Sequence, residues 1–317
     1  MPRYRHNLPQ LRDEFFMTDG GIETTLIFQE GQDLPHFAAF HLLKSQEGFE
    51  VLRKYFRSYV DLAARFATGL ILETATWRAN PDWAAKLGYD ARALATANRA
   101  AVDLVAQLRD ESGYPVVVSG CIGPRGDGYV PDRAMSAREA QNYHRAQIAT
   151  FAATDADLVT AITMNYVEEA VGIALAAREA EMPAVISFTV ETDGRLPTGQ
   201  SLEDAIRQTD FETSAYPAYY MLNCAHPAHF TDAVRDAKAW MSRIRGLRAN
   251  ASKMSHAELN EATELDPGDP VELGHVYASL LRGGLGQLHV FGGCCGTDLR
   301  HVEQIATACL PAFHRSV

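Results

Sequence analysis

The sequence lacks the features of a membrane, secreted or nucleic-acid-binding protein. No apolar run approaches the roughly 18 residues needed to cross a bilayer. The opening MPRYRHNLPQLRDEFF carries charges where a signal peptide needs an apolar stretch. Basic residues are in deficit, because 29 Lys and Arg face 40 Asp and Glu and leave a net charge of −11. A chain this acidic lacks the electrostatic footprint of a nucleic-acid binder. We therefore expect a cytoplasmic protein with no membrane or nucleic-acid partner.

Cysteine is scarce and odd in number, with five residues in the chain. A disulfide framework is disfavoured in a reducing compartment, so thiol or metal chemistry becomes the question. No Pro- or Ser-rich linker divides the sequence, and no GxGxxG follows its first apolar run, so a Rossmann-type nucleotide site is unsupported. What is present is 317 residues that are 47% hydrophobic, enough for a large core. We expect one domain over residues 1–317.

Short apolar, β-branched runs alternate with stretches of helical periodicity along the chain. Strands that alternate with helices are typical of a parallel sheet, and eight such units fit a (β/α)8 TIM barrel of about 250 residues plus insertions. A doubly wound open sheet is the alternative. Strands are predicted at 15–19, 69–75, 115–120, 157–163, 183–189, 218–223, 244–249 and 288–293. Helices are predicted at 48–67, 91–111, 136–153, 167–180, 227–241 and 298–309, and one more begins near Leu202.

The longest irregular stretch runs from Asn250 to Pro270, after the seventh predicted strand. Loops that follow the strands of a barrel lie on its catalytic face, so this stretch is a candidate lid or substrate wall. Its polar residues Asn250, Ser252, His256 and Glu258 are candidates for lining a substrate site. A solvated loop with helix-capping residues is the simpler interpretation. His256 is also a candidate fourth metal ligand.

Three of the five cysteines follow predicted strands. Cys224 comes after strand 218–223 in MLNCAH, and Cys294 and Cys295 come after strand 288–293 in VFGGCCGTD. Adjacent residues of a strand point to opposite faces, so this pair acts together only if the backbone leaves strand geometry, which the flanking glycines permit. Three thiolates on one face of a barrel can bind zinc and leave a position for substrate. Such a site suits thiol substrates, because the metal lowers the pKa of a bound thiol.

A buried, unreactive side chain is the alternative interpretation of any free cysteine. We accept it for Cys121 and Cys309, which have no partner in a motif. No local CxxC supports a metal site, so spacing alone leaves both interpretations open for the other three cysteines.

Three motifs together resemble the zinc-dependent homocysteine S-methyltransferase family. They are GGCCGT near the carboxyl end, NC some 70 residues earlier, and TDGG near the amino end. The family includes betaine–homocysteine and S-methylmethionine–homocysteine methyltransferases, and the resemblance runs from Met17 to His301. It implies a TIM barrel that binds Zn2+ through Cys224, Cys294 and Cys295, with these three as the catalytic and metal-binding residues.

The resemblance also implies a set of substrate-binding residues. Asp-Gly-Gly after the first strand contacts the amino-acid part of homocysteine in the family, and an aromatic residue lies near the methyl donor. A carboxylate suits an ammonium, and an aromatic face attracts a sulfonium or quaternary ammonium. A common turn and a barrel-end packing residue are the simpler interpretations. The matching residues are Asp19, Gly20, Gly21, Thr74, Trp77 and Thr163.

One position departs from the family pattern. The family carries a glutamate before the threonine at the end of strand four, where it binds the amino group of the substrate. Here Ile162 precedes Thr163. Isoleucine cannot pair with an ammonium, and a lost charged hydrogen bond costs about 1.5–3 kcal/mol. Either another acid, such as Glu73, compensates, or the acceptor is not homocysteine.

The sequence therefore predicts a zinc-dependent methyltransferase. It would move a methyl group from an onium donor, such as S-methylmethionine, S-adenosylmethionine or a betaine, to a thiol, with homocysteine giving methionine as the leading case. Two alternatives stay open: a zinc-dependent demethylase or methyltransferase with a non-homocysteine acceptor, and a non-catalytic barrel that binds zinc or thiols. The donor, and self-association into a homo-oligomer, are left open by the sequence.

Overall fold

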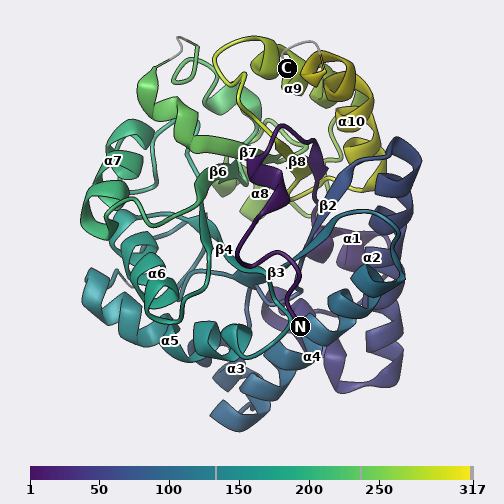
Figure 1. Cartoon of the computed structure of the whole chain (residues 1–317), viewed down its shortest axis with the longest axis vertical. Helices are drawn as coiled ribbons and strands as arrows, with labels where there is room; N and C mark the ends of the chain where they lie inside the picture. Colours follow the sequence, from purple (N-terminus) through teal and green to yellow (C-terminus); the bar gives the residue numbers. More distant parts are fainter. Residues whose placement is uncertain (133, 236–237, 315–317) are drawn as a thin grey trace.

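Eight parallel strands pair in chain order in this computed structural model, and the last pairs with the first. Phe16 of the first strand pairs with Gly69 of the second on one side and with Val290 of the eighth on the other. Figure 1 shows the ring of strands enclosed by helices. The fold is a single-domain (β/α)8 TIM barrel, so the predicted barrel is confirmed and the open sheet is wrong. The structure describes residues 1–132, 134–235 and 238–314.

All eight predicted strands are present, each within a few residues of its expected bounds. They are β1 (Phe16–Met17), β2 (Gly69–Glu73), β3 (Val116–Ile122), β4 (Leu158–Met164), β5 (Ala184–Phe188), β6 (Tyr219–Asn223), β7 (Ile244–Ala249) and β8 (Val290–Gly293). The α-helices are α1 (Ile22–Phe28), α2 (Gln46–Phe66), α3 (Pro81–Lys86), α4 (Ala91–Glu111), α5 (Ala137–Ala152), α6 (Val167–Glu179), α7 (Leu202–Thr213), α8 (His256–Glu261), α9 (Pro270–Arg282) and α10 (Leu299–Phe313).

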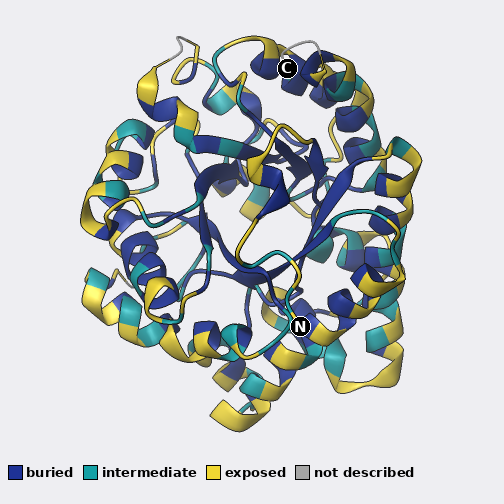
Figure 2. Ribbon diagram, in the orientation of Figure 1, coloured by how far each residue is buried: buried dark blue, intermediate teal, exposed yellow. Residues whose placement is uncertain are grey.

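The outer helices form for local reasons and bury one face against the strands. In α5, Ser136 and Glu139 make a reciprocal capping box, which satisfies backbone N–H groups at the start of the helix. In α2, the Ser45 side chain accepts from the N–H of Gly48, and Ala67 ends the helix in a left-handed conformation. Figure 2 shows strands that are buried along almost their whole length and helices that alternate between buried and exposed sides. This is the burial pattern of a parallel sheet covered by helices.

One predicted helix, at 227–241, is wrong. Apart from residues 236–237, which lie outside the described part, this stretch holds only short 3-10 turns, at Pro227–His229 and Ala239–Arg243. Phe230 and Val234 are buried four residues apart. Helical spacing of apolar residues is therefore also met by an irregular chain that packs onto the barrel.

The amino-terminal segment closes one end of the barrel. Leu8 packs inside the ring against residues from the first three positions of the strands. The backbone N–H groups of Arg3 and Tyr4 both donate to the Asp157 carboxylate at 2.7 Å. In Figure 1 this purple segment crosses the ring. The amino ends of the strands are therefore covered by the chain itself.

The barrel interior becomes polar toward the carboxyl ends of the strands. The hydroxyls of Ser119 and Thr160 lie 2.8 Å apart, and Ser187 donates to the Asn223 side chain at 2.6 Å. All four side chains are buried. Buried polar groups are retained when they are hydrogen-bonded, and here they mark the end of the barrel at which chemistry is expected.

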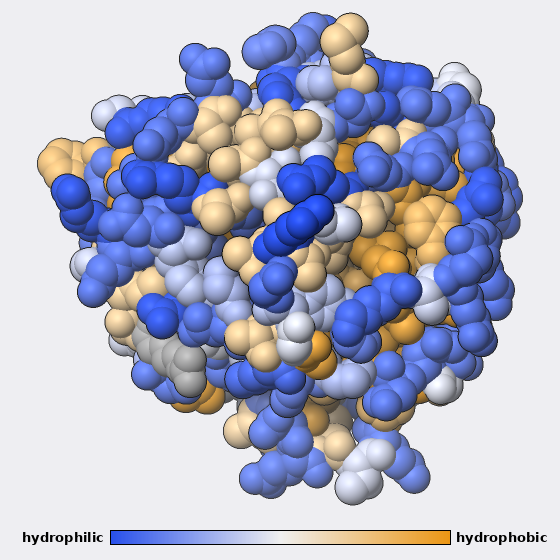
Figure 3. Space-filling model, turned by 90° about the horizontal axis from the view of Figure 1, so that it is seen from below, coloured by the Kyte–Doolittle hydropathy of each residue, from blue (hydrophilic) through white to orange (hydrophobic). Residues whose placement is uncertain are grey.

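The outer surface is dominated by polar side chains. Figure 3 shows one face on which hydrophilic residues prevail and hydrophobic residues gather toward one side. In the described part of the chain, no helix combines the length and apolar character needed to span a membrane.

Asp298 caps the start of α10, just after the loop that carries Cys294 and Cys295. Burial by itself would raise the pKa of this carboxyl. Hydrogen bonds from His301, Arg300 and Gln29 outweigh burial and hold the pKa well below its usual range.

We expect Asp298→Asn to lower the free energy of unfolding at neutral pH by about 1–3 kcal/mol. The folded-state pKa lies below that of the unfolded chain. The ionised carboxyl therefore stabilises fully above about pH 4, and this contribution is lost as the pH falls toward the folded-state pKa. Chemical denaturation between about pH 7 and pH 3 should show the gap between wild type and variant shrinking in acid. A gap that does not change with pH would contradict this account, and the exposed Asp33→Asn is the control.

Candidate functional site

Three cysteines meet at the carboxyl end of the barrel. Cys224 follows β6, and Cys294 and Cys295 follow β8. Their sulfur atoms all lie within 4.8 Å of one another. Cys224 and Cys294 form a disulfide, and the Cys224 sulfur lies 3.8 Å from that of Cys295. The predicted convergence of the three cysteines is confirmed. The expectation against disulfides is wrong for Cys224 and Cys294, because the barrel brings these two strand ends within bonding distance.

The backbone at this site adopts a left-handed conformation at two residues other than glycine. Cys224 has a φ of 55° and Thr163, at the end of β4, has a φ of 65°. Such left-handed conformations are uncommon outside glycine and gather at functional sites. The Asn223 side chain holds Thr163 in place, since it accepts from the Thr163 N–H at 3.0 Å and donates to the Thr163 hydroxyl at 2.8 Å.

The glycines around Cys294 and Cys295 serve two purposes. Gly296 has a φ of 78°, so it supplies the backbone freedom expected from the sequence. Gly292 and Gly293 instead permit close approach, because a side chain on either would collide with the hydroxyls of Thr18 and Thr297. Since β8 ends at Gly293, the Cys-Cys pair lies outside the strand, as predicted.

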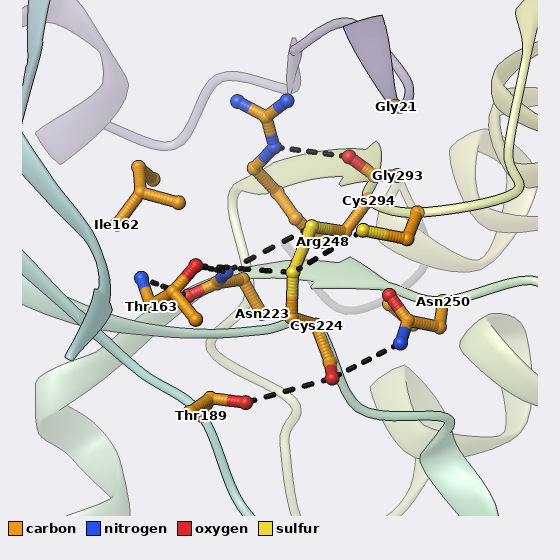
Figure 4. The surroundings of a disulfide bond; sticks show 12 residues. Gly21, Ile162, Thr163, Thr189, Asn223, Cys224, Arg248, Asn250, Gly293 and Cys294 are labelled. Atoms are coloured by element: carbon orange, nitrogen blue, oxygen red, sulfur yellow. Dashed lines mark hydrogen bonds between the residues drawn. A yellow bond between two sulfur atoms is a disulfide. The ribbon is translucent and has the colours of Figure 1, made fainter. Parts of the chain in front are cut away.

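Each sulfur of the cluster has a polar neighbour. The Thr163 hydroxyl lies 3.8 Å from the Cys224 sulfur, the Asn223 amide nitrogen 3.8 Å from that of Cys294, and the Tyr129 hydroxyl 3.7 Å from that of Cys295. Figure 4 shows Thr163 and Asn223 directed toward the sulfur atoms from one side.

The cluster fits a metal ion that prefers sulfur. Burial raises the pKa of the Cys295 thiol to about 11, although the hydrogen bond with Tyr129 works in the opposite direction. Without a nearby cation this thiol is therefore protonated at neutral pH. Once the Cys224–Cys294 disulfide is reduced, three close thiols on two strand ends would provide a soft donor set with a fourth position left for a substrate atom.

The stretch between Asn250 and Pro270 forms one wall of the site through backbone contacts. Asn250 donates to the Cys224 carbonyl at 3.0 Å, and the His256 Nε2 lies 2.5 Å from the same oxygen. His256 also bonds Glu191 through Nδ1 at 3.0 Å and stacks on the Tyr129 ring at 4.2 Å. Both ring nitrogens of His256 are engaged, so the structure does not place it as a fourth metal ligand.

The other two polar residues of this stretch have local roles. The Ser252 hydroxyl accepts from the N–H of Met254. Glu258 completes a capping box with Ser255 at the start of α8, a short helix that the sequence analysis missed. The Ser-x-x-Glu pattern was the available signal for it.

Asp19 is fully engaged inside the barrel mouth. Its carboxylate receives Arg248 at 2.6 Å and the Tyr55 hydroxyl at 3.0 Å. Arg248 also donates to the carbonyls of Gly293 and Gly20, and both members of the ion pair are buried. Arg248 was missed by sequence reasoning. The sequence feature that could have identified it is a charged residue within the apolar run of β7.

The two glycines that follow Asp19 press against the cysteine loop. The Gly21 N–H donates to the Thr297 carbonyl at 3.0 Å, and a side chain at Gly21 would lie 2.5 Å from the Cys294 carbonyl. A side chain at Gly20 would lie 2.9 Å from the Thr297 carbonyl. The Asp-Gly-Gly turn is therefore next to the sulfur cluster, and no side chain fits between them.

The remaining predicted substrate residues lie at or just after the ends of β2 and β4. Thr74 accepts from the Cys121 N–H at 2.9 Å, and the Trp77 indole donates to the Ile162 carbonyl at 3.2 Å. Glu73 lies deeper in the interior, where burial raises its pKa to about 7 while the charge of Arg248 opposes this. Figure 4 shows Ile162 beside the cluster with no polar contact drawn. Their substrate-binding roles stay predictions.

We expect the buried Arg248–Asp19 ion pair to contribute to the stability of the fold. Arg248→Gln should lower the free energy of unfolding by about 3–5 kcal/mol, because it leaves a buried carboxylate without its cation. Combining it with Asp19→Asn should recover a large part of the loss. Chemical denaturation of the four members of this cycle measures the coupling, with the exposed Arg92→Gln as control. Losses that simply add would show that the pair is not coupled.

The fold and the site together define a class, that of TIM-barrel proteins with a three-cysteine site at the carboxyl ends of the strands. Within this class, the chain belongs to the homocysteine S-methyltransferase family, because the family model described as "Homocysteine S-methyltransferase" matches residues 16–309. It is therefore an enzyme of that family, and the alternative of a non-catalytic barrel is not supported.

Solved structures share the fold at low sequence identity. The homocysteine methyltransferase MmuM from Escherichia coli in its oxidized form matches with a TM-score of 0.74 and 18% identity, over 96% of this chain and 99% of that one. The metallated form of the same protein matches with a TM-score of 0.70 and 19% identity, over 95% and 98%. At this level of identity, the likeness establishes the barrel and its extent alone.

Proposed function

We propose that this enzyme transfers a methyl group from an onium donor to a thiol acceptor, with Zn2+ bound by Cys224, Cys294 and Cys295. Homocysteine, which would yield methionine, is the acceptor that the family favours. The observation that carries the proposal is the convergence of three sulfur atoms within 4.8 Å at the carboxyl end of the barrel. The metallated form of the similar E. coli MmuM supports a metal in such a barrel.

The residues around the sulfurs suit this role. Zinc bound there would lower the pKa of an acceptor thiol and favour its thiolate at neutral pH. The Thr163 hydroxyl, the Asn223 amide and the Tyr129 hydroxyl are each in reach of one ligand sulfur, where they can donate and stabilise its negative charge. These donors also fix the directions of the three cysteines.

The transfer itself is a single displacement. The acceptor sulfur attacks the methyl carbon, a new sulfur–carbon bond forms, and the old bond breaks with its electron pair moving to the onium atom of the donor. The protein's task is to align the two substrates and exclude water. The stacked rings of Tyr129 and His256 form an aromatic wall beside Cys295 that serves this purpose. Asp19, Gly20, Gly21, Thr74, Thr163 and Glu73 stay as proposed substrate-site residues.

A second candidate function keeps the metal and changes the acceptor. Ile162 offers no charge to an ammonium, and the Asp19 carboxylate is already paired with Arg248 at 2.6 Å. These two observations favour a thiol other than homocysteine if no further acid serves the site. We keep S-methylmethionine, S-adenosylmethionine and betaines as donor candidates for both functions. A reducing compartment such as the cytoplasm would keep the thiols available as ligands.

The metal proposal is tested by removing one ligand. Reduced, zinc-loaded wild type should bind about one zinc per chain, and Cys294→Ala should lose most of it together with methyl transfer, by at least about a hundredfold. Elemental analysis and methionine formation from the three donors measure both. Cys309→Ala, a buried cysteine outside the cluster, is the matched control. Unchanged zinc and turnover in Cys294→Ala would refute the site. The disulfide-bonded form should take up little zinc until reductant is added, because the thiolate is the ligand.

A further inference from the structure

A second pair of charged residues lies beside the sulfur cluster and is left unused by the contacts described above. Arg78 follows β2, and Glu23 lies in the first turn of α1, two residues after Gly21. Neither residue belongs to a sequence motif that predicts a functional role.

Among the residues that the structure describes, Arg78 is a buried cation that no carboxylate pairs with. It is 7% exposed, and its guanidinium lies between the rings of Trp77 and Trp83, at 4.0 and 3.9 Å from their centres. One terminal nitrogen donates to the Gly126 carbonyl at 3.0 Å. Its Nε has no hydrogen-bond partner within the described residues, which also offer no carboxylate within 4.0 Å. A buried charge left in this state is costly, so an anion is the group that the site lacks.

The Arg78 sandwich reaches the cysteine cluster from one side. Gly128 lies next to both the Trp77 ring and Thr163, since a side chain built there would lie 3.1 Å from the ring and 3.3 Å from the Thr163 methyl. The Thr163 hydroxyl is the group 3.8 Å from the Cys224 sulfur. Burial lowers the pKa of Arg78 to about 10, while Asp127, Tyr129 and Glu23 oppose this.

Glu23 is a carboxylate near this site that remains available. It is partly exposed, and no side-chain hydrogen bond joins it to another residue in the part of the chain that the structure describes. Asp19, by contrast, spends both oxygens on Arg248 and Tyr55. Burial raises the pKa of Glu23 to about 7, with Asp19 adding to this and Arg78 opposing it. Its charge is also felt at Cys295.

We propose that Arg78 and Glu23 bind the amino-acid head group of the thiol acceptor, Arg78 its carboxylate and Glu23 its ammonium. The inference rests on the proposed thiol methyltransferase function. It also accounts for Ile162, because the acid that pairs with the ammonium then comes from the β1 side of the barrel. A planar guanidinium held by two aromatic faces is preorganised for a two-point contact with a carboxylate.

The proposal is tested with acceptors that lack one charge each. Homocysteine carries both groups, 4-mercaptobutanoate lacks the ammonium, and 3-mercaptopropylamine lacks the carboxylate. Arg78→Gln should raise KM by about ten- to a hundredfold for homocysteine and 4-mercaptobutanoate and leave 3-mercaptopropylamine nearly unchanged. Glu23→Gln should do the same for homocysteine and 3-mercaptopropylamine and spare 4-mercaptobutanoate. Arg78→Lys should recover part of the loss.

Several controls separate this assignment from a purely structural role. A structural defect would lower turnover of all three acceptors alike, together with zinc content or Tm, and would overturn the proposal. Equal KM values in wild type and variants would do so too. Methyl donors also carry carboxylates, so S-methylmethionine is compared with trimethylsulfonium. A loss that appears only with S-methylmethionine would assign Arg78 to the donor and overturn its assignment to the acceptor. Arg92→Gln is the matched exposed control.

A binding measurement keeps the result independent of turnover. Calorimetric titration of the reduced, zinc-loaded full chain with homocysteine should give a Kd that rises about ten- to a hundredfold in each of Arg78→Gln and Glu23→Gln. Failure of methyl transfer with every donor, with this binding pattern intact, would refute the proposed function and leave the head-group site standing. Absence of homocysteine binding, or equal binding by variants and wild type, would refute the site.

Discussion

The pairing of β8 with β1 is the contact on which the rest of the structure depends. It converts a row of eight parallel strands into a ring, with Phe16 and Met17 opposite Val290 and Phe291. A ring of parallel strands presents all carboxyl ends on one side. Cys224 and the Cys294–Cys295 pair, 70 residues apart in sequence, meet for that reason. In an open sheet without that pairing, β6 and β8 would have no common centre to face.

The same end of the barrel concentrates charge that the interior must satisfy. Apolar side chains fill the amino end, where Leu8 plugs the ring. Toward the carboxyl end, Arg248 neutralises Asp19 and also bonds the carbonyls of Gly20 and Gly293. One side chain thus ties the ends of β1, β7 and β8 together. Burial makes this pair strongly coupled, because either charge alone would be left in a medium of low polarity.

Much of the fold followed from local patterns. Eight buried apolar runs separated by helical periodicity are enough to indicate parallel strands, and eight such units indicated a barrel. The segment at 227–241 shows the limit, because Phe230 and Val234 have helical spacing and yet are buried from irregular turns. The spacing of apolar residues indicates which residues are buried, and it does not determine the backbone conformation that buries them. The short α8 was missed for the opposite reason, since its signal was a cap without an apolar face.

The features of the site also fall into those that the sequence determined and those that only the structure decided. The sequence by itself determined which residue types could bind a metal, and their positions after predicted strands, because thiol chemistry belongs to the cysteine side chain wherever it lies. It also exposed the departure at Ile162. Only the tertiary structure decided that Asp19 is occupied by Arg248, that both ring nitrogens of His256 are engaged, and that Arg78 lies between two tryptophans with its Nε unpartnered. Whether a charge is free or paired depends on contacts between strands and loops far apart in the chain, and no local pattern encodes those.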